Sequence, residues 1–320
     1  MSTEPAASRH LRVLDGLDAE LVASVRRLLA AAQEADGTAA INEQTLLAIE
    51  AGEAPGARHL LGTASAGSRE AVVAYAHLDL PAPGSGSDID ALVEASAECV
   101  VHPEHRRRGW GTALLRHVLG ESAPHPVRVW AHGDHPGAAA LARSLGLDRV
   151  RELWQMRRDL TVPLPDVELP AGVHVRAFVV GVDEPEWLAM NARAFADHPE
   201  QGGIDATDLA RRTAAEWFDA DGFFLAERDS RPVGFHWTKV HPADGSRPPV
   251  GEVYVVGVDP LAQGGGLGRV LTLIGLHHLR DRGLGEVLLY VEGDNLPARR
   301  VYERLGFARV ATDVQYRSQP

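Results

Sequence analysis

Gln263-Gly264-Gly265-Gly266-Leu267-Gly268 stands between an apolar run, Val255 to Val258, and a stretch of helical periodicity, Leu267 to Leu279. Four of these six residues are glycine, so few side chains cover the backbone N–H groups of the segment. The first N–H groups of a helix have no intrahelical partner and lie at the positive end of the helix dipole, where they bind anions. The stretch therefore predicts a strand, an anion-binding loop and a helix, in that order.

Two common phosphate-binding loops do not fit this stretch. A Walker loop needs a lysine after its last glycine, but Arg269 follows Gly268 and the chain's only lysine is Lys239. A Rossmann fingerprint needs glycine at the sixth position from Gly264, where Arg269 stands, and it opens its fold rather than lying near the end. The remaining pattern is Gln-x-x-Gly-x-Gly behind a strand that ends in Val-Asp-Pro.

Internal repetition indicates the domain organisation. The segment Cys99 to Gly111 aligns with Val256 to Gly268 at an offset of 157 residues, with proline on proline and glycine on glycine. Further along, Gly133 to Leu147 aligns with Gly293 to Phe307 at an offset of 160 residues. The chain therefore contains two copies of one domain in tandem.

The boundary between the copies is expected in Thr161 to Pro170, whose three prolines predict an extended linker. We expect an N-terminal domain over residues 1–160, a linker over 161–170 and a C-terminal domain over 171–320. In each copy, predicted hairpins precede β-α-β units. This order is typical of an α+β domain with a mixed central sheet flanked by helices.

The composition limits the kinds of partner. A chain of 320 residues is long enough for two domains, and its net charge of -12 argues against nucleic acid or an anionic membrane as a partner. The single cysteine, Cys99, excludes an internal disulfide. Met1 to Ser8 lack the apolar core that a signal peptide needs, and no apolar run reaches the roughly 18 residues of a membrane span. We expect a cytoplasmic protein and a monomer.

A second motif follows the glycine loop by about 30 residues. It runs Asn295-x-x-Ala298-x-x-x-Tyr302-x-x-x-Gly306-Phe307. Together the two motifs resemble those of the GCN5-related N-acetyltransferase (GNAT) family. The resemblance implies acetyl-CoA as co-substrate, a loop that holds its pyrophosphate, a tyrosine that faces the thioester sulfur, and chemistry without a metal ion.

Attack of an amine on a thioester needs an unprotonated nitrogen, a polarised carbonyl and a proton for the departing thiolate. Tyr302 is the candidate acid, because a phenol with a pKa near 10 is close to an alkyl thiol in acidity. Glu252, which opens the strand Glu252 to Val258, is the candidate base. The main-chain N–H groups of Val256 to Val258 would polarise the carbonyl. The alternatives are a packing role for Tyr302 and a solvated strand-end charge for Glu252.

The two copies differ at both candidate catalytic positions. The first copy has Ala142 where the second has Tyr302, and Ala95 where the second has Glu252. We therefore expect the first copy to hold the cofactor without doing chemistry.

Two pairs of histidines in the first copy, His102 with His105 and His132 with His135, raise the question of a metal site. No cysteine or carboxylate stands beside them in the arrangement of a ligand set, so we interpret all four as solvated loop histidines.

Within the acetyltransferases, the chain resembles the mycothiol synthase family, whose members have a weakened first half and an active second half. The resemblance rests on Glu252 to Pro260, Asn191 to Gly202 and Leu289 to Asn295, and it covers nearly the whole chain. It implies acetyl transfer to the cysteinyl amine of a cysteine-glucosamine-inositol pseudodisaccharide. The residues implied for that substrate are Glu34, Glu184, Lys239, Glu252 and Tyr290.

By the same resemblance, acetyl-CoA would contact the strand, loop and last helix of the second copy, and a second CoA would contact the first. The residues implied in the second copy are Val256, Gly257, Val258, Gln263, Gly264, Gly265, Gly266, Leu267, Gly268, Arg269, Asn295, Leu296, Pro297, Ala298, Arg299 and Arg300. Those implied in the first copy are Cys99, Val100, Val101, Arg106, Arg107, Arg108, Gly109, Trp110, Gly111 and Thr112.

The residues by themselves indicate only an acyl-CoA-dependent N-acyltransferase. Lys239, as the lone lysine, suggests a compact cation for a hydroxylated substrate, although chance retention at a surface explains it equally well. Two alternatives stay open: acetylation of another amine, such as an aminoglycoside or a protein N-terminus, and a CoA-sensing module without turnover.

Overall fold

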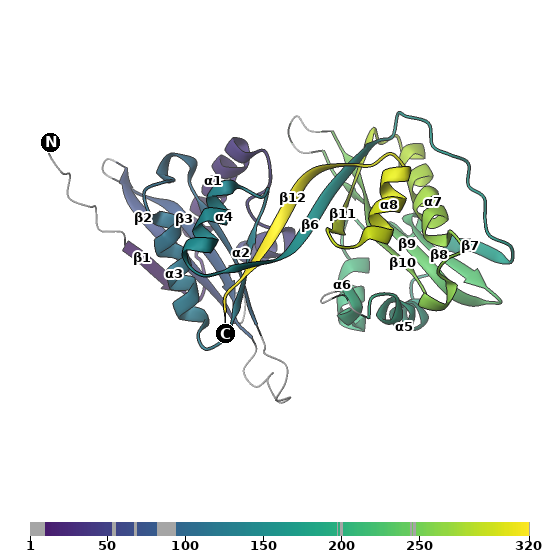
Figure 1. Ribbon diagram of the computed structural model, residues 1–320, viewed down its shortest axis with the longest axis horizontal. Coiled ribbons are helices and arrows are strands. Elements are labelled where there is room, and N and C mark those ends of the chain that lie inside the picture. The colour runs from purple at the N-terminus through teal and green to yellow at the C-terminus, as the bar shows by residue number, and fades with distance from the viewer. Residues whose placement is uncertain are drawn as a thin grey trace. The chain divides into compact units, whose positions relative to one another are not determined.

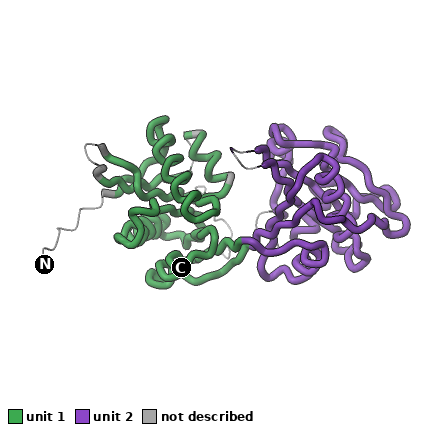
Figure 2. Tube along the Cα trace, turned by 90° about the horizontal axis from the view of Figure 1, so that it is seen from above, with its two compact units in different colours: residues 1–153, 311–320 green, residues 154–310 purple. Residues whose placement is uncertain are grey.

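The computed structural model describes residues 10–52, 56–66, 69–81, 94–196, 198, 201–243, 245 and 248–319. The chain forms two compact units (Figure 2). Unit 1 contains Met1–Leu153 together with Ala311–Pro320, and unit 2 contains Trp154–Val310. Both are α+β, in agreement with the predicted fold class, and each is described by itself below.

Unit 1 has a mixed sheet with helices on both faces (Figure 1). The only parallel pair with a recorded register in this unit joins β4 to β5. Helices α1 and α2 pack on one face and α3 and α4 on the other. In spatial order the strands are β1 (His10–Leu14), β2 (Ala57–Ala66), β3 (Arg69–Asp79), β4 (Ala95–Val101), β5 (Val127–Ala131) and the end of β12 (Ala308–Arg317). The helices are α1 (Ala19–Asp36), α2 (Glu43–Ala51), α3 (Trp110–Ser122) and α4 (Pro136–Ser144).

Unit 2 repeats this arrangement. Its parallel pair is β10 with β11; helices α5 and α6 pack on one face, and α7 and α8 on the other. In spatial order the strands are the end of β6 (Asp148–Asp159), β11 (Glu286–Glu292), β10 (Val250–Val258), β9 (Arg231–His241), β8 (Phe223–Arg228) and β7 (Val173–Ala177). The helices are α5 (Glu184–Ala194), α6 (Ala206–Thr213), α7 (Leu267–Asp281) and α8 (Leu296–Arg304).

The unit boundaries depart from the expected ones, because the closing strand of each repeat ends in the other unit. The last residues of β12 pair antiparallel with β5, from Val314 opposite Ala131 to Arg317 opposite Arg128. Val314 and Tyr316 are buried in the core of unit 1. The end of β6 in turn lies beside β11 in unit 2. Apolar burial on a strand edge, rather than position in the sequence, decides where these residues belong.

The expected linker, residues 161–170, contains neither helix nor strand, as its prolines predict. It nevertheless packs on unit 2. The Arg158 guanidinium donates to the carbonyl oxygens of Val162 and Pro163, and His277 Nε2 lies 2.9 Å from the carbonyl oxygen of Pro165. The segment is therefore part of the second unit rather than a free spacer.

Side-chain caps fix the helices on the α1 and α2 face. Asp18 accepts a hydrogen bond from the N–H of Leu21, and Asn42 accepts one from Thr45, so both helices begin where polar caps satisfy free donors. The apolar periodicity of the sequence predicts this first helix over Asp18 to Ala32. In the structure α1 runs on to Asp36 and stops at Gly37, which has a φ of 73°. None of the helices that the structure describes is long and apolar enough to cross a membrane.

Candidate active site

The glycine loop between β10 and α7 presents an uncovered helix start. Gly264 and Gly266 have φ values of 86° and 77°, a left-handed conformation that glycine adopts without strain. Gly266 is the N-cap of α7 and provides no side-chain hydrogen bond. A Cβ atom added at Gly264, Gly265 or Gly266 would meet nothing within 4 Å, so this face of the loop is open. The loop therefore has the open helix start that the predicted anion site requires, and anion binding stays a prediction.

The first loop has the same backbone. Arg107 and Gly109, the counterparts of Gly264 and Gly266, have φ values of 58° and 83°. Gly109 is the N-cap of α3 and likewise makes no side-chain cap. A non-glycine residue in this conformation costs about 1 kcal/mol. Unit 1 therefore keeps the anion-binding geometry even where its sequence lacks the glycine.

A side chain at the start of each loop reaches back to the preceding strand. Gln263 Nε2 donates to the carbonyl of Val258 over 3.3 Å, and Arg106 Nε donates to the equivalent carbonyl of Val101 over 3.1 Å. Arg106 also forms two hydrogen bonds with Asp36, of 2.6 and 2.7 Å, which hold the pKa of Asp36 below its ordinary value. The Arg106 guanidinium is therefore already engaged, and only its backbone fits the expected contact with CoA.

In unit 2 an ion pair joins the first helix to the segment before the loop. The acidic and basic residues of this pair have exchanged places relative to the pair in unit 1. Arg193, in the last turn of α5, contacts Asp259 Oδ2 at 2.7 Å. In unit 1 the aspartate is on the helix and the arginine is in the loop. Arg193 is about half exposed, so the pair contributes at most about 1 kcal/mol to stability. Its effect is to fix the position of the loop relative to the helix.

The two parallel strands of unit 2 separate in front of the loop. The pairing of β10 with β11 covers Gly251 to Val253 opposite Val287 to Leu289, whereas β10 stays paired with β9 as far as Val258. Beyond Val253, the backbone N–H and C=O groups on the β11 side of β10 are not part of the recorded pairing with β11. These include the predicted cofactor contacts Val256 to Val258. In unit 1 the pairing of β4 with β5 ends at Glu98 opposite Trp130, just before Cys99 to Val101.

A β-bulge at Tyr254 changes which side chains share a face. The register of β10 with β9 shifts between Val253 and Val255. Tyr254 and Val255 both pack toward α5 and α6, while Val253 and Val256 pack toward α7 and α8. A bulge of this kind redirects side chains beside a site. The recorded register of β3 with β4 in unit 1 has no such shift.

Glu252, Lys239 and Tyr290 lie on the face that α5 and α6 cover. Glu252 is directly opposite Lys239 on β9 and Leu288 on β11, and Tyr290 follows Leu288 by two residues. Glu252 is 7% exposed and Lys239 is 5% exposed, whereas Tyr290 is 45% exposed. The structure thus brings together three of the five predicted substrate residues.

The two buried charges have different neighbours. Glu252 Oε2 lies 2.6 Å from His241 Nε2. The Lys239 ammonium lies 4.6 Å from the ring centroid of Trp217 and 5.5 Å from that of Tyr254. Cation–π contacts of a desolvated ammonium contribute about 2 kcal/mol. The Lys239 ammonium therefore packs against the rings of Trp217 and Tyr254. Because Lys239 is buried, it is not a lysine retained by chance on the surface.

Tyr302 lies in α8, with its ring 5.8 Å from that of Phe307. Burial raises the pKa of Tyr302 to about 12. This corrects the expectation of a phenol near its ordinary pKa of about 10. The same exclusion of water raises the proton affinity of a thiolate formed beside it, so transfer from the phenol to sulfur stays feasible.

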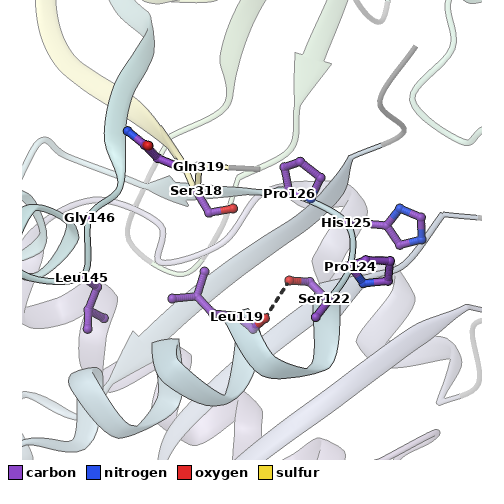
Figure 3. A pocket seen from close by; sticks show the side chains of 10 residues that line it. Leu119, Ser122, Pro124, His125, Pro126, Leu145, Gly146, Ser318 and Gln319 are labelled. Carbon is purple, nitrogen blue, oxygen red and sulfur yellow. Dashed lines mark hydrogen bonds between the residues drawn. The ribbon is translucent and has the colours of Figure 1, made fainter. Parts of the chain in front are cut away.

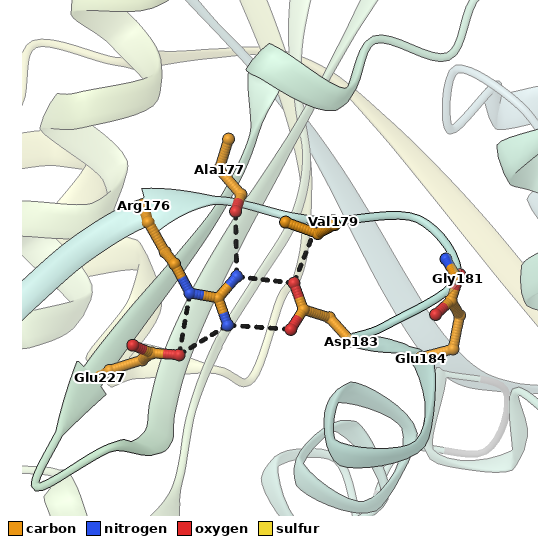
Figure 4. Close-up of polar contacts among 7 residues, drawn as sticks. All are labelled: Arg176, Ala177, Val179, Gly181, Asp183, Glu184 and Glu227. Atoms are coloured by element: carbon orange, nitrogen blue, oxygen red, sulfur yellow. Dashed lines mark hydrogen bonds and ion pairs between the residues drawn. The ribbon is translucent and has the colours of Figure 1, made fainter.

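Glu184 and Glu34 do not join this group. Figure 4 shows Glu184 at the start of α5, where Oε1 accepts a 2.6 Å hydrogen bond from the N–H of Gly181. The neighbouring Asp183 pairs with Arg176 of the edge strand β7, two strands beyond β9 and away from β10. The sequence predicts Glu34 just after the first helix, but the structure places it as an exposed residue within α1 of unit 1. The carboxylate there with recorded hydrogen bonds to Arg106 is Asp36.

The start of α8 divides the predicted cofactor residues into two groups. Asn295 is the N-cap and accepts from the N–H of Ala298, while Leu296, Pro297 and Arg300 are exposed. The Arg299 guanidinium instead lies 3.6 Å from the ring centroid of Trp154 and donates to the carbonyl of Gly293. Its side chain therefore supports the helix.

Two further predicted cofactor contacts, Leu267 and Trp110, are buried side chains at equivalent positions of the two loops. They anchor the loops in the core, so only their backbones can meet a cofactor. The other described loop positions of unit 1, Arg107, Arg108, Gly111 and Thr112, are exposed or half-buried and stay expectations.

Unit 1 has a polar row where unit 2 has an aromatic one. Across the sheet of unit 2, Phe223, Trp237 and Val255 are directly opposite one another. The equivalent row of unit 1 is His59, His77 and Glu98. All three are almost fully buried, and burial lowers the pKa of His59 to about 4. The two units therefore differ on the face that carries the candidate acceptor site.

His132 is not the solvated loop residue that was expected. Its Nε2 lies 2.7 Å from Glu98 Oε1 and its Nδ1 lies 3.1 Å from Asp313 Oδ2. Glu98 also accepts from the N–H of Asn42, and Asp313 accepts from the N–H of Gly133. Burial by itself would lower the pKa of His132, but the hydrogen bonds to Asp313 and Glu98 outweigh it and raise the pKa to about 9.

Unit 1 is therefore expected to lose stability as pH rises toward 9. The folded pKa of His132 exceeds its ordinary value of 6.5, so the stabilisation is complete below pH 6.5 and is lost as pH rises through 9. The loss is at most about 3 kcal/mol. Hydrogen exchange of peptides from β4 and β5 at pH 6.5, 8 and 9.5 measures it. His132→Gln should abolish the dependence, and the exposed His117→Gln should keep it; an unchanged profile in His132→Gln would refute the assignment.

A cavity of about 350 Å³ lies elsewhere in unit 1, at the end of α3 (Figure 3). Its walls include Leu119, Ser122, His125, Ser318 and Gln319. No predicted site residue lines it. The candidate active site is defined by open backbone and converging side chains, not by this cavity.

Four residues of the site region were not predicted from the sequence: His241, Trp217, Tyr254 and Asp36. Strand alternation from Lys239 and Glu252 would have placed His241 and Tyr254 on the same face, two residues further along each strand. Trp217 and Asp36 come from other parts of the chain and had no local signal.

The fold and the two open loops define an acyl-CoA-binding transferase of the N-acetyltransferase type. The model of the acetyltransferase (GNAT) family matches residues 27–147 and 187–307, and the chain belongs to that family. This confirms the resemblance inferred from the two motifs.

Within the family, the chain is similar to mycothiol acetyltransferases. The protein of that name from Thermomonospora curvata is 56% identical over 315 residues, which are 98% of each chain. The one from Saccharomonospora viridis is 53% identical over 305 residues, 94% of this chain and 96% of that protein. A solved GCN5-related N-acetyltransferase from Sphaerobacter thermophilus has a TM-score of 0.71 at 24% identity, covers 96% of this chain and 95% of its own, and supports the fold alone.

Proposed function

We propose that unit 2 transfers the acetyl group of acetyl-CoA to the cysteinyl amine of 1D-myo-inositol 2-(L-cysteinylamino)-2-deoxy-α-D-glucopyranoside, giving mycothiol and CoA. One observation carries the proposal. Glu252 and Tyr302 stand before and after an open anion-binding loop in unit 2, whereas unit 1 has the buried residues Ala95 and Ala142 at these positions. The similarity to mycothiol acetyltransferases supports the choice of acceptor.

The backbone of unit 2 would bind the co-substrate. The uncovered N–H groups at the start of α7, from Leu267 to Arg269, suit the two charges of a pyrophosphate. The free edge of β10 at Val256 to Val258 suits the amide groups of the pantetheine arm and the thioester carbonyl. Exposed Arg300 would add a cation near the start of α8.

Following the protons through the reaction gives Glu252 and Tyr302 one role each. The acceptor arrives as an ammonium, and Glu252 takes one proton to free the nitrogen lone pair. The nitrogen attacks the carbonyl carbon, the C–S bond breaks, and Tyr302 protonates the departing thiolate. The second proton on nitrogen returns to the Tyr302 phenolate. One proton per turnover therefore remains on Glu252 and must leave to solvent.

The acceptor would lie on the α5 and α6 face beside Lys239, Glu252 and Tyr290. A compact ammonium and a phenol hydroxyl are suited to the many hydroxyl groups of a sugar and an inositol. Glu184 has no part in this proposal because its carboxylate is bound to its own loop. Unit 1 would hold a second acetyl-CoA without transferring it.

Purified protein mixed with acetyl-CoA and the cysteinyl pseudodisaccharide is expected to release CoA, measured with a thiol reagent after correction for the acceptor's own thiol. Mass spectrometry should show the acceptor heavier by one acetyl group on nitrogen. Release with an aminoglycoside, together with no release with the pseudodisaccharide, would refute the proposed acceptor. No release with any amine would favour the CoA-sensing alternative.

We further propose that the protein works as a cytosolic monomer, since acetyl-CoA is a cytosolic metabolite and each unit contains its own loop. Light scattering should then give a mass near 34.4 kDa.

A further inference from the structure

The side chain of the base proposed above has one recorded hydrogen-bond partner among the residues that the structure describes. Glu252 Oε2 lies 2.6 Å from His241 Nε2. The glutamate side chain is 9% exposed and the histidine side chain is 38% exposed. His241 ends β9 and is paired with Val250, so it lies diagonally beside Glu252 on the same face of the sheet. The histidine therefore connects a buried carboxylate to the solvent.

The other charged and titratable groups on this face include Lys239, Tyr254 and Tyr290 of the candidate acceptor site. They also include Glu286 and Glu292 of β11, which pair with Arg157 and His198. Lys239 on β9 is directly opposite Glu252, and Tyr290 on β11 follows its other neighbour. On β10, Tyr254 accepts a hydrogen bond from Arg212 of α6. The 2.6 Å contact between Glu252 Oε2 and His241 Nε2 is a recorded route from this carboxylate to a second titratable group.

We propose that His241 is a positioning residue that holds Glu252 and carries its proton to solvent in each turnover. This inference rests on the proposed function in one respect only, the assignment of Glu252 as the base. It does not depend on which amine is acetylated.

The proton balance of the reaction requires a path that takes one proton from Glu252 to solvent in each turnover. Each turnover leaves one proton on Glu252, because the ammonium loses a proton that neither the amide nor CoA keeps. A protonated Glu252 cannot accept the next ammonium proton until this one has left. His241 Nε2 can take it from Oε2, and the partly exposed imidazolium can return it to water. The Glu252 side chain is only 9% exposed, so without His241 its proton could leave only past the bound acceptor.

Two variants separate this role from mere support of the strand. In His241→Gln, the side-chain amide can still donate to Glu252, but it cannot carry a proton. We expect kcat at pH 7 to fall about tenfold, with less than a threefold change in KM for either substrate. Added imidazole should restore at least half of the lost rate. In His241→Leu both the hydrogen bond and the relay are lost, so the fall should be larger and only partly restored.

The matched control is His174→Gln, an exposed histidine on β7 of the same unit, for which we expect unchanged kcat and no response to imidazole. In Glu252→Gln, adding His241→Gln should cause no further loss, because the relay has nothing left to carry. Wild-type kcat and pH profile in His241→Gln would overturn the proposal. A loss that imidazole does not restore, and that adds fully to that of Glu252→Gln, would also overturn it.

Failure of the proposed function gives a different pattern. If Glu252→Gln keeps full turnover, the base assignment is wrong and the relay falls with it. If the wild type acetylates another amine, only the acceptor is wrong, and the same variants measured with that amine still decide the role of His241.

Discussion

Gly266→Glu is expected to lower kcat/KM for acetyl-CoA by at least about 10²-fold. Gly266 is the N-cap of α7 at the open face of the loop. A carboxylate there would place a negative charge among the N–H groups that we assign to the pyrophosphate. The repulsion and the lost hydrogen bonds together correspond to about 3 kcal/mol or more.

The matched variant Gly109→Glu should leave turnover within about twofold. Gly109 has the equivalent place in unit 1, with a φ of 83° against 77° for Gly266. Both substitutions therefore introduce a similar backbone strain, about 1 to 2 kcal/mol. A difference in rate between the two then reports the loop's role in the reaction rather than its folding.

Steady-state kinetics with varied acetyl-CoA, together with thermal unfolding of each variant, tests the pair. Equal loss of turnover in both folded variants would contradict the division into a silent and an active unit. In that case the cofactor site of unit 1 would have to contribute to the reaction.

Tyr302→Phe is expected to lower the rate of the chemical step by about 10² to 10³-fold with little change in KM. The structure records no hydrogen bond from the Tyr302 hydroxyl to any residue that it describes, so its removal should not cost stability. The ring remains beside Phe307. Single-turnover acetyl transfer measures the step even when product release limits kcat.

The raised pKa of Tyr302 adds a pH test. With a pKa of about 12, the phenol keeps its proton between pH 6 and 10, so deprotonation of Tyr302 should produce no alkaline fall in wild-type rate over that range. Replacing Tyr302 by alanine would remove both the packed ring and the hydroxyl group, so their effects could not be separated. Phenylalanine keeps the ring and removes only the hydroxyl group. A Tyr302→Phe enzyme with an undiminished single-turnover rate would show that another group, or water, protonates the thiolate.

The parts of the molecule that the sequence predicts are those encoded locally. The run of glycines from Gly264 to Gly266 predicts an open loop before a helix, and the structure has that loop, with Gly264 and Gly266 in the left-handed conformation. Arg107, which aligns with Gly264, has the same left-handed conformation in unit 1, although an arginine by itself does not predict it. Asp18, directly before the apolar periodicity of the first helix, is also a local signal, and its predicted role as the helix cap is confirmed.

The parts that the sequence does not predict depend on contacts between distant residues. The bond between Asp36 and Arg106 spans 70 residues, and the contact of Gly133 with Asp313 spans 180. His132 was interpreted as a solvated histidine because its two carboxylate partners are far away in the sequence. The bulge at Tyr254 has no glycine or other local signal that marks it in the sequence. The roles of Glu252 and Tyr302 in catalysis remain predictions that the kinetic experiments above decide.

The place of β12 has a consequence for how the protein is made. A ribosome finishes the rest of unit 1 long before it reaches Val314 and Tyr316, which complete the core of that unit and pair with β5. During synthesis the nascent first half therefore has an open sheet edge at β5, of the kind that invites wrong pairing. Pairing of β12 with β5 closes that edge, so unit 1 is completed only after the whole of unit 2 has been synthesised.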